Sequence, residues 1–278
     1  PPQPLFLITK GGKCDGSESL PFEINCIEDL VVLSKISNGT SSELGFEQSN
    51  FNGKYIVLKR ALDFESIFSY SDYTSTKYGD LNEDGNIENV MTELTKKNDE
   101  CIGFTPIGLV GGYMHFDGIF NGNDFEIRNI YINGKNSEKS YGLFGNARYG
   151  EIKNLTVKGI IKATGIAAGL VGYIDDGENV VNCKNFCEII STENFAGGII
   201  GYSRGPIINK CANFGNINGI DSDDNKLITE LTTGSGFIPI GQYRKDFKGD
   251  FDGLNHKIIN LYEKNSGSRM GLFGCVIS

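Results

Sequence analysis

The stretch from residue 80 to residue 93 has the clearest chemical potential in this chain. It begins Asp-Leu-Asn-Glu-Asp-Gly-Asn-Ile-Glu, with side-chain oxygens at loop positions 1, 3 and 5 and a glycine at position 6. This pattern is typical of the start of an EF-hand-like calcium loop, in which alternating oxygen ligands converge on one ion. The predicted ligands are Asp80, Asn82, Asp84, Asn86, Glu88 and Glu93.

The loop departs from the pattern at position 12, where Met91 replaces the expected bidentate acid. Glu93 can substitute only if the loop bulges, so the expected cofactor is a weakly held Ca²⁺, which extracellular calcium concentrations would still load. The alternative is a turn rich in Asp, Asn and Gly that binds no ion. Asp221, Asp223 and Asp224 form a second acidic group, but it lacks the glycine and the spacing.

Three tyrosines, Tyr70, Tyr73 and Tyr78, precede the acidic loop. Binding residues concentrate on loops that project from a rigid scaffold, and aromatic rings can stack on sugars, so these tyrosines are candidate ligand-binding residues. The alternative is that they cover the flank of the scaffold. Trp, the commonest sugar-stacking side chain, is absent.

Candidates for catalysis are few. His115 and His256 are the only histidines, and neither an HExxH nor a Gly-x-Ser-x-Gly motif occurs. Asp117, Asp124 and Arg128 could form the carboxylate-and-cation groove of a β-helix enzyme that acts on acidic polysaccharides, but solvated turn residues are the simpler interpretation. We therefore expect no catalytic residues.

The seven cysteines contain no CxxC pair. Cys183 and Cys187 are too far apart on one extended strand to bridge each other, and a structural zinc site is disfavoured because no histidine lies near them in sequence. If the chain stacks as described below, Cys183 lies over Cys211, within disulfide reach. The alternative is that both act as small buried hydrophobes.

The composition excludes two classes of partner. A net charge of −9 disfavours nucleic acid, because phosphate neutralisation requires clustered Lys and Arg. The sequence has no run of 18 apolar residues, so this segment predicts no membrane span. Nothing in the sequence indicates the oligomeric state.

A glycine tetrapeptide recurs along the chain and indicates the scaffold that would position the candidate residues described above. Its first three copies begin at Gly142, Gly169 and Gly198, a nearly constant spacing that is typical of a solenoid coil. The copies are Gly142-Leu-Phe-Gly145, Gly169-Leu-Val-Gly172, Gly198-Ile-Ile-Gly201 and Gly271-Leu-Phe-Gly274.

A second segment follows each of the first three tetrapeptides and repeats at a constant offset of 28 in the numbering. Each unit is thus predicted to hold two short strands. A parallel stack would align Leu155, Cys183 and Cys211 in one inward row, Ile161, Ile189 and Ile217 in another, and Asn185 with Asn213. An earlier segment, Ile130–Gly134, fits at an offset of 25.

A longer duplication and a different N-terminal region frame these coils. Phe104-Thr-Pro-Ile-Gly108 recurs as Phe237-Ile-Pro-Ile-Gly241, and each copy leads to a Gly-Leu-Phe-Gly. Cys26–Ile36 has apolar residues in helical spacing and is followed by Gly39, which predicts a capping helix. Tyr55–Leu58 is predicted to be a strand.

The tetrapeptides, the Phe-Asp-Gly units before them and the Glu28-Asp29-Leu30 helix resemble the GLUG-repeat proteins of bacterial cell surfaces. That family includes adhesin-like proteins and non-catalytic regions of some immunoglobulin A metallopeptidases. The resemblance implies a secreted or cell-wall-attached β-solenoid. It implies no catalytic residues, because the motif carries none.

The sequence therefore predicts an all-β, right-handed parallel β-helix or β-solenoid with a short N-terminal capping helix. We divide it into a cap and first coil (1–60), a protruding acidic and Tyr-rich insertion (61–103) and solenoid coils (104–278) that continue beyond Ser278. The expected function is a non-catalytic adhesin-like scaffold or stalk stabilised by calcium, with a host or cell-surface protein or glycan as partner. The alternatives are a carbohydrate- or host-protein-binding module of a larger secreted enzyme and, more remotely, a polysaccharide lyase or hydrolase.

Overall fold

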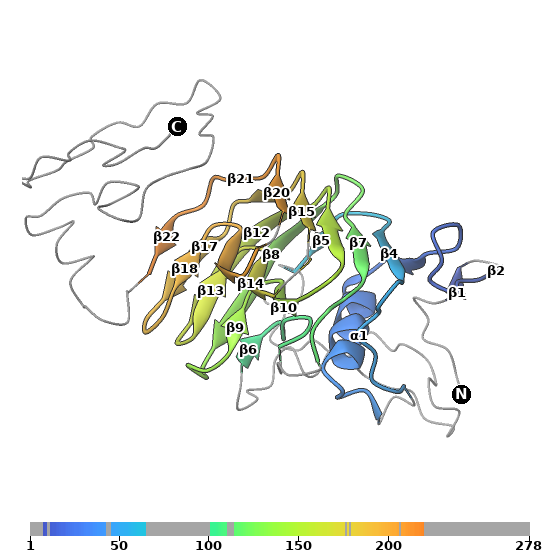
Figure 1. The fold of residues 1–278 in the computed structure, drawn as a ribbon, viewed down its shortest axis with the longest axis horizontal. Helices are drawn as coiled ribbons and strands as arrows, with labels where there is room; N and C mark the ends of the chain where they lie inside the picture. The colour runs from blue at the N-terminus through green and yellow to red at the C-terminus, as the bar shows by residue number, and fades with distance from the viewer. Residues whose placement is uncertain are drawn as a thin grey trace, which may run out of the picture. The chain divides into compact units, whose positions relative to one another are not determined.

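The predicted solenoid is present in the computed structural model, which describes residues 8–9, 12–42, 46–64, 101–109, 114–175, 177, 179–205 and 207–219. In this part the chain winds into stacked, mostly parallel strands with one helix, α1, near the N-terminal end of the stack (Figure 1). The all-β parallel β-solenoid with an N-terminal helix is thus confirmed. The chain forms two compact units, residues 1–219 and 220–278, and every described residue lies in the first. No described helix has the length and apolar character needed to cross a membrane.

Between residues 140 and 219 each coil has four sides, and each side pairs in parallel with the same side of the next coil. The prediction of two strands per unit is wrong, because several sides are strands of only two or three residues, in which apolar alternation cannot stand out. The four ladders are β9 (Ser140–Tyr141), β13 (Ile166–Ala168) and β18 (Ala196–Gly197); β10 (Phe144–Ala147), β14 (Val171–Ile174) and β19 (Ile200–Ser203); β11 (Glu151–Lys153), β15 (Asn179–Val181) and β20 (Ile207–Asn209); and β12 (Thr156–Ala163), β16 with β17 (Lys184–Asn185, Glu188–Ser191) and β21 with β22 (Ala212–Asn213, Ile217–Asn218).

Two of these ladders continue toward the N-terminus. In the third ladder a single inward row of large apolar side chains runs through Phe22, Ile56, Phe120, Ile152 and Val180, all of them buried. Burying each such side chain contributes about 1.5–3 kcal/mol, so the stack itself creates the core. The additional strands are β3 (Phe22–Ile24), β4 (Tyr55–Leu58) and β7 (Ile119–Asn121) in the third ladder; β5 (Leu62–Asp63), β6 (Cys101–Gly103) and β8 (Glu126–Gly134) in the fourth; and the separate antiparallel pair β1 (Ile8–Thr9) and β2 (Gly12–Lys13).

The rows predicted at an offset of 28 are confirmed. Ile161 pairs with Ile189, and Ile189 with Ile217. Asn185 pairs with Asn213, and its Nδ2 donates to the Asn213 Oδ1 over 2.7 Å. The Leu155, Cys183 and Cys211 row lies directly beside these pairs and follows the same register.

The earlier coil does not follow the predicted offset of 25. Ile130 pairs with Gly159 and Ile132 with Ile161, an offset of 29, whereas Ile127 pairs with Val157. One extra residue in β8 therefore separates the two halves of this pairing. Asn129, in the left-handed region at φ 56°, lies in this bulge. Alternating apolar residues repeat every two positions, so a shift of four residues keeps the inward side chains inward and the apolar pattern alone cannot distinguish an offset of 25 from one of 29.

The proposed insertion, residues 61–103, begins and ends in strands that pair with β8. At its start β5 runs parallel to β8, and at its end β6 runs antiparallel. Residues 65–100 lie outside the described part of the chain.

The predicted capping helix forms as α1 (Ile27–Ser37), and Tyr55–Leu58 forms β4 as predicted. Asp29 Oδ2 accepts the backbone N–H of Asn25 over 2.7 Å and that of Cys26 over 3.2 Å, which satisfies two donors at the N-terminal end of the helix. After the helix, buried Asn38 links α1 to the following coil. Its Oδ1 accepts the Leu109 N–H over 2.7 Å, and its Nδ2 donates to the Pro106 carbonyl over 2.8 Å.

In the three described glycine tetrapeptides, the first two residues form the corner between the first and second sides of the coil, and the last two begin the second strand. The first glycine of the second and third copies is required by packing. A Cβ added at Gly169 would lie 2.2 Å from the Asn185 amide, and one at Gly198 would lie 2.4 Å from that of Asn213. The absence of a side chain at each of these two glycines therefore leaves the room that an asparagine side chain fills inside the coil.

Candidate functional site

The predicted calcium ligands and the three predicted ligand-binding tyrosines all lie outside the described residues. They are Asp80, Asn82, Asp84, Asn86, Glu88 and Glu93, with Tyr70, Tyr73 and Tyr78. The second acidic group at 221–224 and His256 also lie outside. In the described part of the chain, no group of three or more His, Cys, Asp or Glu side chains is placed to hold a metal ion.

The three residues considered for a polysaccharide-cleaving groove have different partners. Asp117 is buried beside His115, with 3.0 Å between Asp117 Oδ1 and His115 Nε2. Asp124 accepts from Asn182 Nδ2 over 3.3 Å, while Arg128 Nε donates to Asp63 Oδ2 over 2.8 Å. These contacts give each group a separate structural role.

The His115–Asp117 pair holds the corner from which β7 starts. Asn50 Nδ2 donates to Asp117 Oδ2 over 2.8 Å, and the Asp117 N–H donates to the Asn50 carbonyl over 2.7 Å. Burial raises the pKa of Asp117, against the lowering effect of His115 and Arg148 nearby. A carboxylate held by a neighbouring loop in this way positions the backbone.

A face built from arginine and tyrosine side chains lies at the ends of β10, β14 and β19, and we call it the Arg–Tyr face. Tyr173 and Tyr202 are paired in register, and their rings stack with centroids 5.5 Å apart and planes inclined by 7°. At the following positions of the three coils are Arg148, Asp175 and Arg204, so cationic and anionic side chains alternate along the stack. The face comprises Arg148, Tyr149, Tyr173, Asp175, Tyr202 and Arg204.

Arg148 is held by its neighbours within this face. Its Nη2 donates to the Tyr149 hydroxyl over 2.6 Å, its Cζ lies 4.4 Å from the centre of that ring, and its Nε is 3.9 Å from Asp175 Oδ2. The pKa of Arg204 is raised by Tyr173, Tyr202 and Asp175. Since Tyr149 and Tyr202 are exposed, their phenol groups face solvent beside the guanidinium donors of this face.

An aromatic column runs outside the β12, β16 and β21 ladder. Phe186 and Phe214 stack with centroids 4.7 Å apart, and Lys158 Nζ lies 5.1 Å from the centre of the Phe186 ring. These three residues occupy equivalent positions in successive coils. Phe186 has a neighbour from an adjacent coil on each face, so this ring stabilises the stack and offers mainly its edge to solvent.

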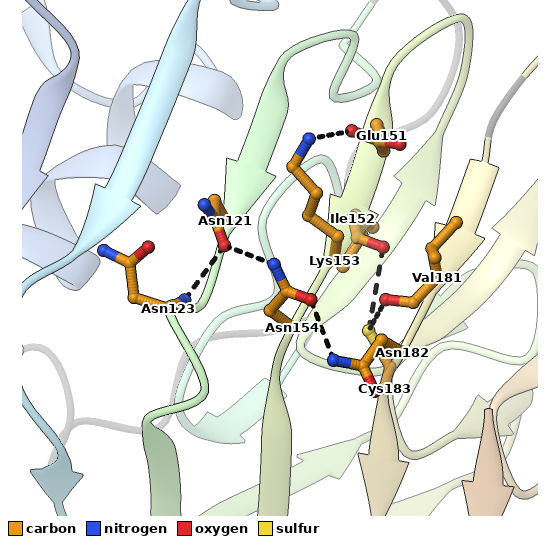
Figure 2. A network of polar contacts seen from close by, with 9 residues as sticks. All are labelled: Asn121, Asn123, Glu151, Ile152, Lys153, Asn154, Val181, Asn182 and Cys183. Carbon is orange, nitrogen blue, oxygen red and sulfur yellow. Dashed lines mark hydrogen bonds and ion pairs between the residues drawn. The ribbon is translucent and has the colours of Figure 1, made fainter. Parts of the chain in front are cut away.

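Asparagines form a ladder at the ends of the β7, β11 and β15 strands, which Figure 2 shows: Asn121 is the last residue of β7, whereas Asn154 and Asn182 directly follow β11 and β15. Asn154 Nδ2 donates to Asn121 Oδ1 over 3.0 Å, and Asn182 Nδ2 donates to Asn154 Oδ1 over 2.8 Å. Asn154, Asn182 and Lys210 each have φ 53° at equivalent positions, a left-handed conformation that asparagine tolerates well. Asn154 and Asn182 therefore have two roles: their backbone turns the corner, and their side chains hydrogen-bond neighbouring coils to each other.

Sequence reasoning missed these outer rows, although a signal for each was present. Phe186 and Phe214 lie within the segments that repeat at a constant offset, and Asn154 and Asn182 directly precede two members of the inward Leu/Cys row. The tyrosine pair was marked by the glycine tetrapeptides, because Tyr173 directly follows Gly172 and Tyr202 directly follows Gly201, the last glycines of two successive copies.

Cys183, Cys187 and Cys211 are free thiols in this structure. Cys183 and Cys187 are buried, whereas Cys211 is half-buried. Cys183 and Cys211 both pack in the stack, but the interpretation that both are buried fits Cys183 only.

Comparisons with known proteins show no family. No family model matches the chain, and no curated protein matches it. One matching solved structure is a crystal structure from Bacteroides ovatus, described as that of "a putative immunoglobulin A1 protease". The two are 16% identical with a TM-score of 0.37, and the match covers 73% of this chain and 59% of the other. A likeness of this size says nothing about activity.

Proposed function

We propose that this chain is a non-catalytic, adhesin-like scaffold or stalk on the outside of a bacterial cell, of the GLUG-repeat type. The observation that supports this function is that the outer side chains repeat in register like the core. Tyr173 stacks on Tyr202, Phe186 on Phe214, and Asn182 bonds to Asn154. A surface built from repeated rows suits a spacer, whose role depends on shape and rigidity rather than on one unique constellation of groups.

Rigidity follows from how the coils are joined. Each of the three coils between residues 140 and 219 is hydrogen-bonded to its neighbour along four sides. Bending the stack would have to open several ladders together, and the buried rows resist sliding because neighbouring side chains interdigitate. We expect this rigidity to hold an attached domain or loop away from the cell wall.

Surface display and an activity assay together test this proposal. The full chain, anchored on a non-adherent bacterium, should confer attachment to epithelial cells under flow, whereas the same anchor without the chain should not. Purified chain incubated with acidic polysaccharides and with immunoglobulin A should release no fragments. Reproducible cleavage of either substrate, or attachment equal to that of the bare anchor, would overturn the proposal.

Calcium belongs to the proposal as the ion that stabilises the acidic loop at 80–93, on the strength of its sequence pattern. Adding millimolar Ca²⁺ should raise the melting temperature of the full chain, and a chelator should reverse the rise. An Asp80→Asn/Asp84→Asn variant should melt at one temperature in both conditions. An unchanged melting temperature of the parent chain would remove calcium from the proposed function.

The Arg–Tyr face favours a second candidate function, a binding module for an acidic glycan within a larger secreted protein. Guanidinium groups bind carboxylates through paired donors, and exposed phenols add hydrogen bonds to sugar hydroxyls. The variant Arg148→Gln/Arg204→Gln should lose binding to sialylated or uronic-acid glycans on an array. Arg128→Gln, which changes an exposed arginine on β8, is the matched control. The loop tyrosines Tyr70, Tyr73 and Tyr78 would be the next residues to change.

A further inference from the structure

Cys183 and Cys211 occupy the same position in successive coils. The residues that follow them, Lys184 and Ala212, are paired in β16 and β21, and the Ala212 N–H donates to the Cys183 carbonyl over 3.0 Å. Equivalent backbone positions on neighbouring parallel strands lie about 4.8 Å apart. This spacing falls within the range of about 4.4–6.8 Å between Cα atoms that a disulfide accepts.

The two thiols also point the same way. Cys183 Sγ lies 3.3 Å from the Val181 carbonyl and 3.6 Å from that of Ile152, contacts drawn in Figure 2. Cys211 Sγ makes the equivalent contacts one coil later, 3.4 Å from both the Val180 and the Asn209 carbonyls. Turning the sulfurs toward each other gives up only these weak S–H···O contacts.

The two thiols differ in access. Cys183 is fully buried, while Cys211 is half-buried and can be reached from solvent. The neighbouring Cys183 lowers the pKa of Cys211 to about 7, whereas the pKa of Cys183 is raised by its contact with Cys211 and by burial. Since the thiolate is the nucleophile in disulfide exchange, Cys211 is the side chain that reacts first.

We propose that Cys183 and Cys211 form an oxidisable pair, which a small-molecule disulfide converts into a covalent link between successive coils. The Cys211 thiolate attacks one sulfur of the reagent, which forms a mixed disulfide and releases one thiolate. Cys183 Sγ then attacks Cys211 Sγ, the mixed disulfide bond breaks, and the departing sulfur takes up the Cys183 proton. The protein loses two electrons and two protons, and the reagent is reduced to two thiols.

The disulfide would close a loop of one whole coil, so we expect it to stabilise the stack against unfolding. A disulfide stabilises mainly by restricting the unfolded chain, and the effect grows with loop length. Cys187 provides a contrast within the same coil. Its equivalent positions in the neighbouring coils are Gly159 and Gly215, so it has no thiol beside it.

Peptide mapping of the full chain tests the proposal. The folded protein is incubated with oxidised glutathione, alkylated and digested with trypsin, which cleaves after Lys184 and Lys210 and so puts Cys183, Cys187 and Cys211 on three separate peptides. We expect a linked pair of the Cys183 and Cys211 peptides, lighter by two hydrogens than their sum. We also expect a higher melting temperature, which a reductant reverses.

Two variants separate this pair from general thiol oxidation. Cys211→Ser should lose both the linked peptides and the reductant-sensitive rise in melting temperature, while Cys187→Ser should keep both. Alkylation of both Cys183 and Cys211 after oxidation, or a lasting glutathione adduct on Cys211 without a link, would overturn the proposal. The mapping of the unsubstituted chain decides the matter even if a variant fails to fold.

Discussion

Replacing Asn185 with valine removes an amide that joins two coils inside the stack. Asn185 is fully buried. Its Oδ1 accepts the Cys187 N–H over 3.0 Å, and its Nδ2 donates to Asn213 Oδ1 over 2.7 Å. The preceding coil has Val157 at the equivalent position, which shows that a valine fits the backbone there. The substitution therefore tests hydrogen bonding more than shape.

The expected cost follows from the groups that lose partners. The Cys187 N–H loses its acceptor in a buried position, at a cost of about 1–3 kcal/mol. Asn213 is exposed, so its Oδ1 can turn to water at little cost. The greater apolar burial of valine returns at most about 1 kcal/mol. We expect Asn185→Val to lower the free energy of unfolding by about 1–2 kcal/mol.

Urea denaturation followed by far-ultraviolet circular dichroism measures this loss, and amide hydrogen exchange at Cys187 reports it locally. The matched control is Asn216→Val, the same change at an exposed position, which should stay within about 0.5 kcal/mol of the parent chain. An Asn185→Val protein as stable as the control, with unchanged protection of the Cys187 amide, would refute the reasoning that the buried amide ladder stabilises the coils.

Three further predictions address other parts of the fold. Gly169→Ala should destabilise the chain by about 3 kcal/mol, because its Cβ would overlap the Asn185 amide. Gly53→Ala, with φ +68° and open space around it, should cost only about 1 kcal/mol, and equal losses in denaturant titrations would contradict this difference. Asn38→Ala should cost about 1–3 kcal/mol, since it leaves the buried Leu109 N–H without its acceptor and takes the shorter of two donors from the Pro106 carbonyl; a melting temperature equal to that of the parent would disprove this role. Burial raises the pKa of Asp29 from 3.8 to about 6, so this group favours folding fully below pH 3.8 and loses that contribution as the pH rises through 6. Asp29→Asn should therefore reduce the loss of stability between pH 4 and pH 7 by about 2 kcal/mol, and parallel pH profiles for the two proteins would refute the assignment.

The sequence alone determined the solenoid and most of its register. A repeat must bury the same face in every coil, so the inward positions recur as similar residues at a constant offset, and the Ile161, Ile189 and Ile217 row could be read directly. Local signals were also sufficient for α1, because helical spacing and the terminating Gly39 act within a few residues.

Only the tertiary structure decided the features that depend on contacts across or between coils. The pairing of β8 at an offset of 29, in place of the predicted 25, is one example, because a shift of four residues leaves the alternation of inward and outward side chains unchanged. The bulge at Asn129 then changes the offset by one further residue. The reason for Gly169 became visible only where Asn185 fills the space beside it. The shared orientation of the Cys183 and Cys211 thiols likewise depends on the backbone around them, because sequence spacing sets which residues are neighbours but not where their side chains point.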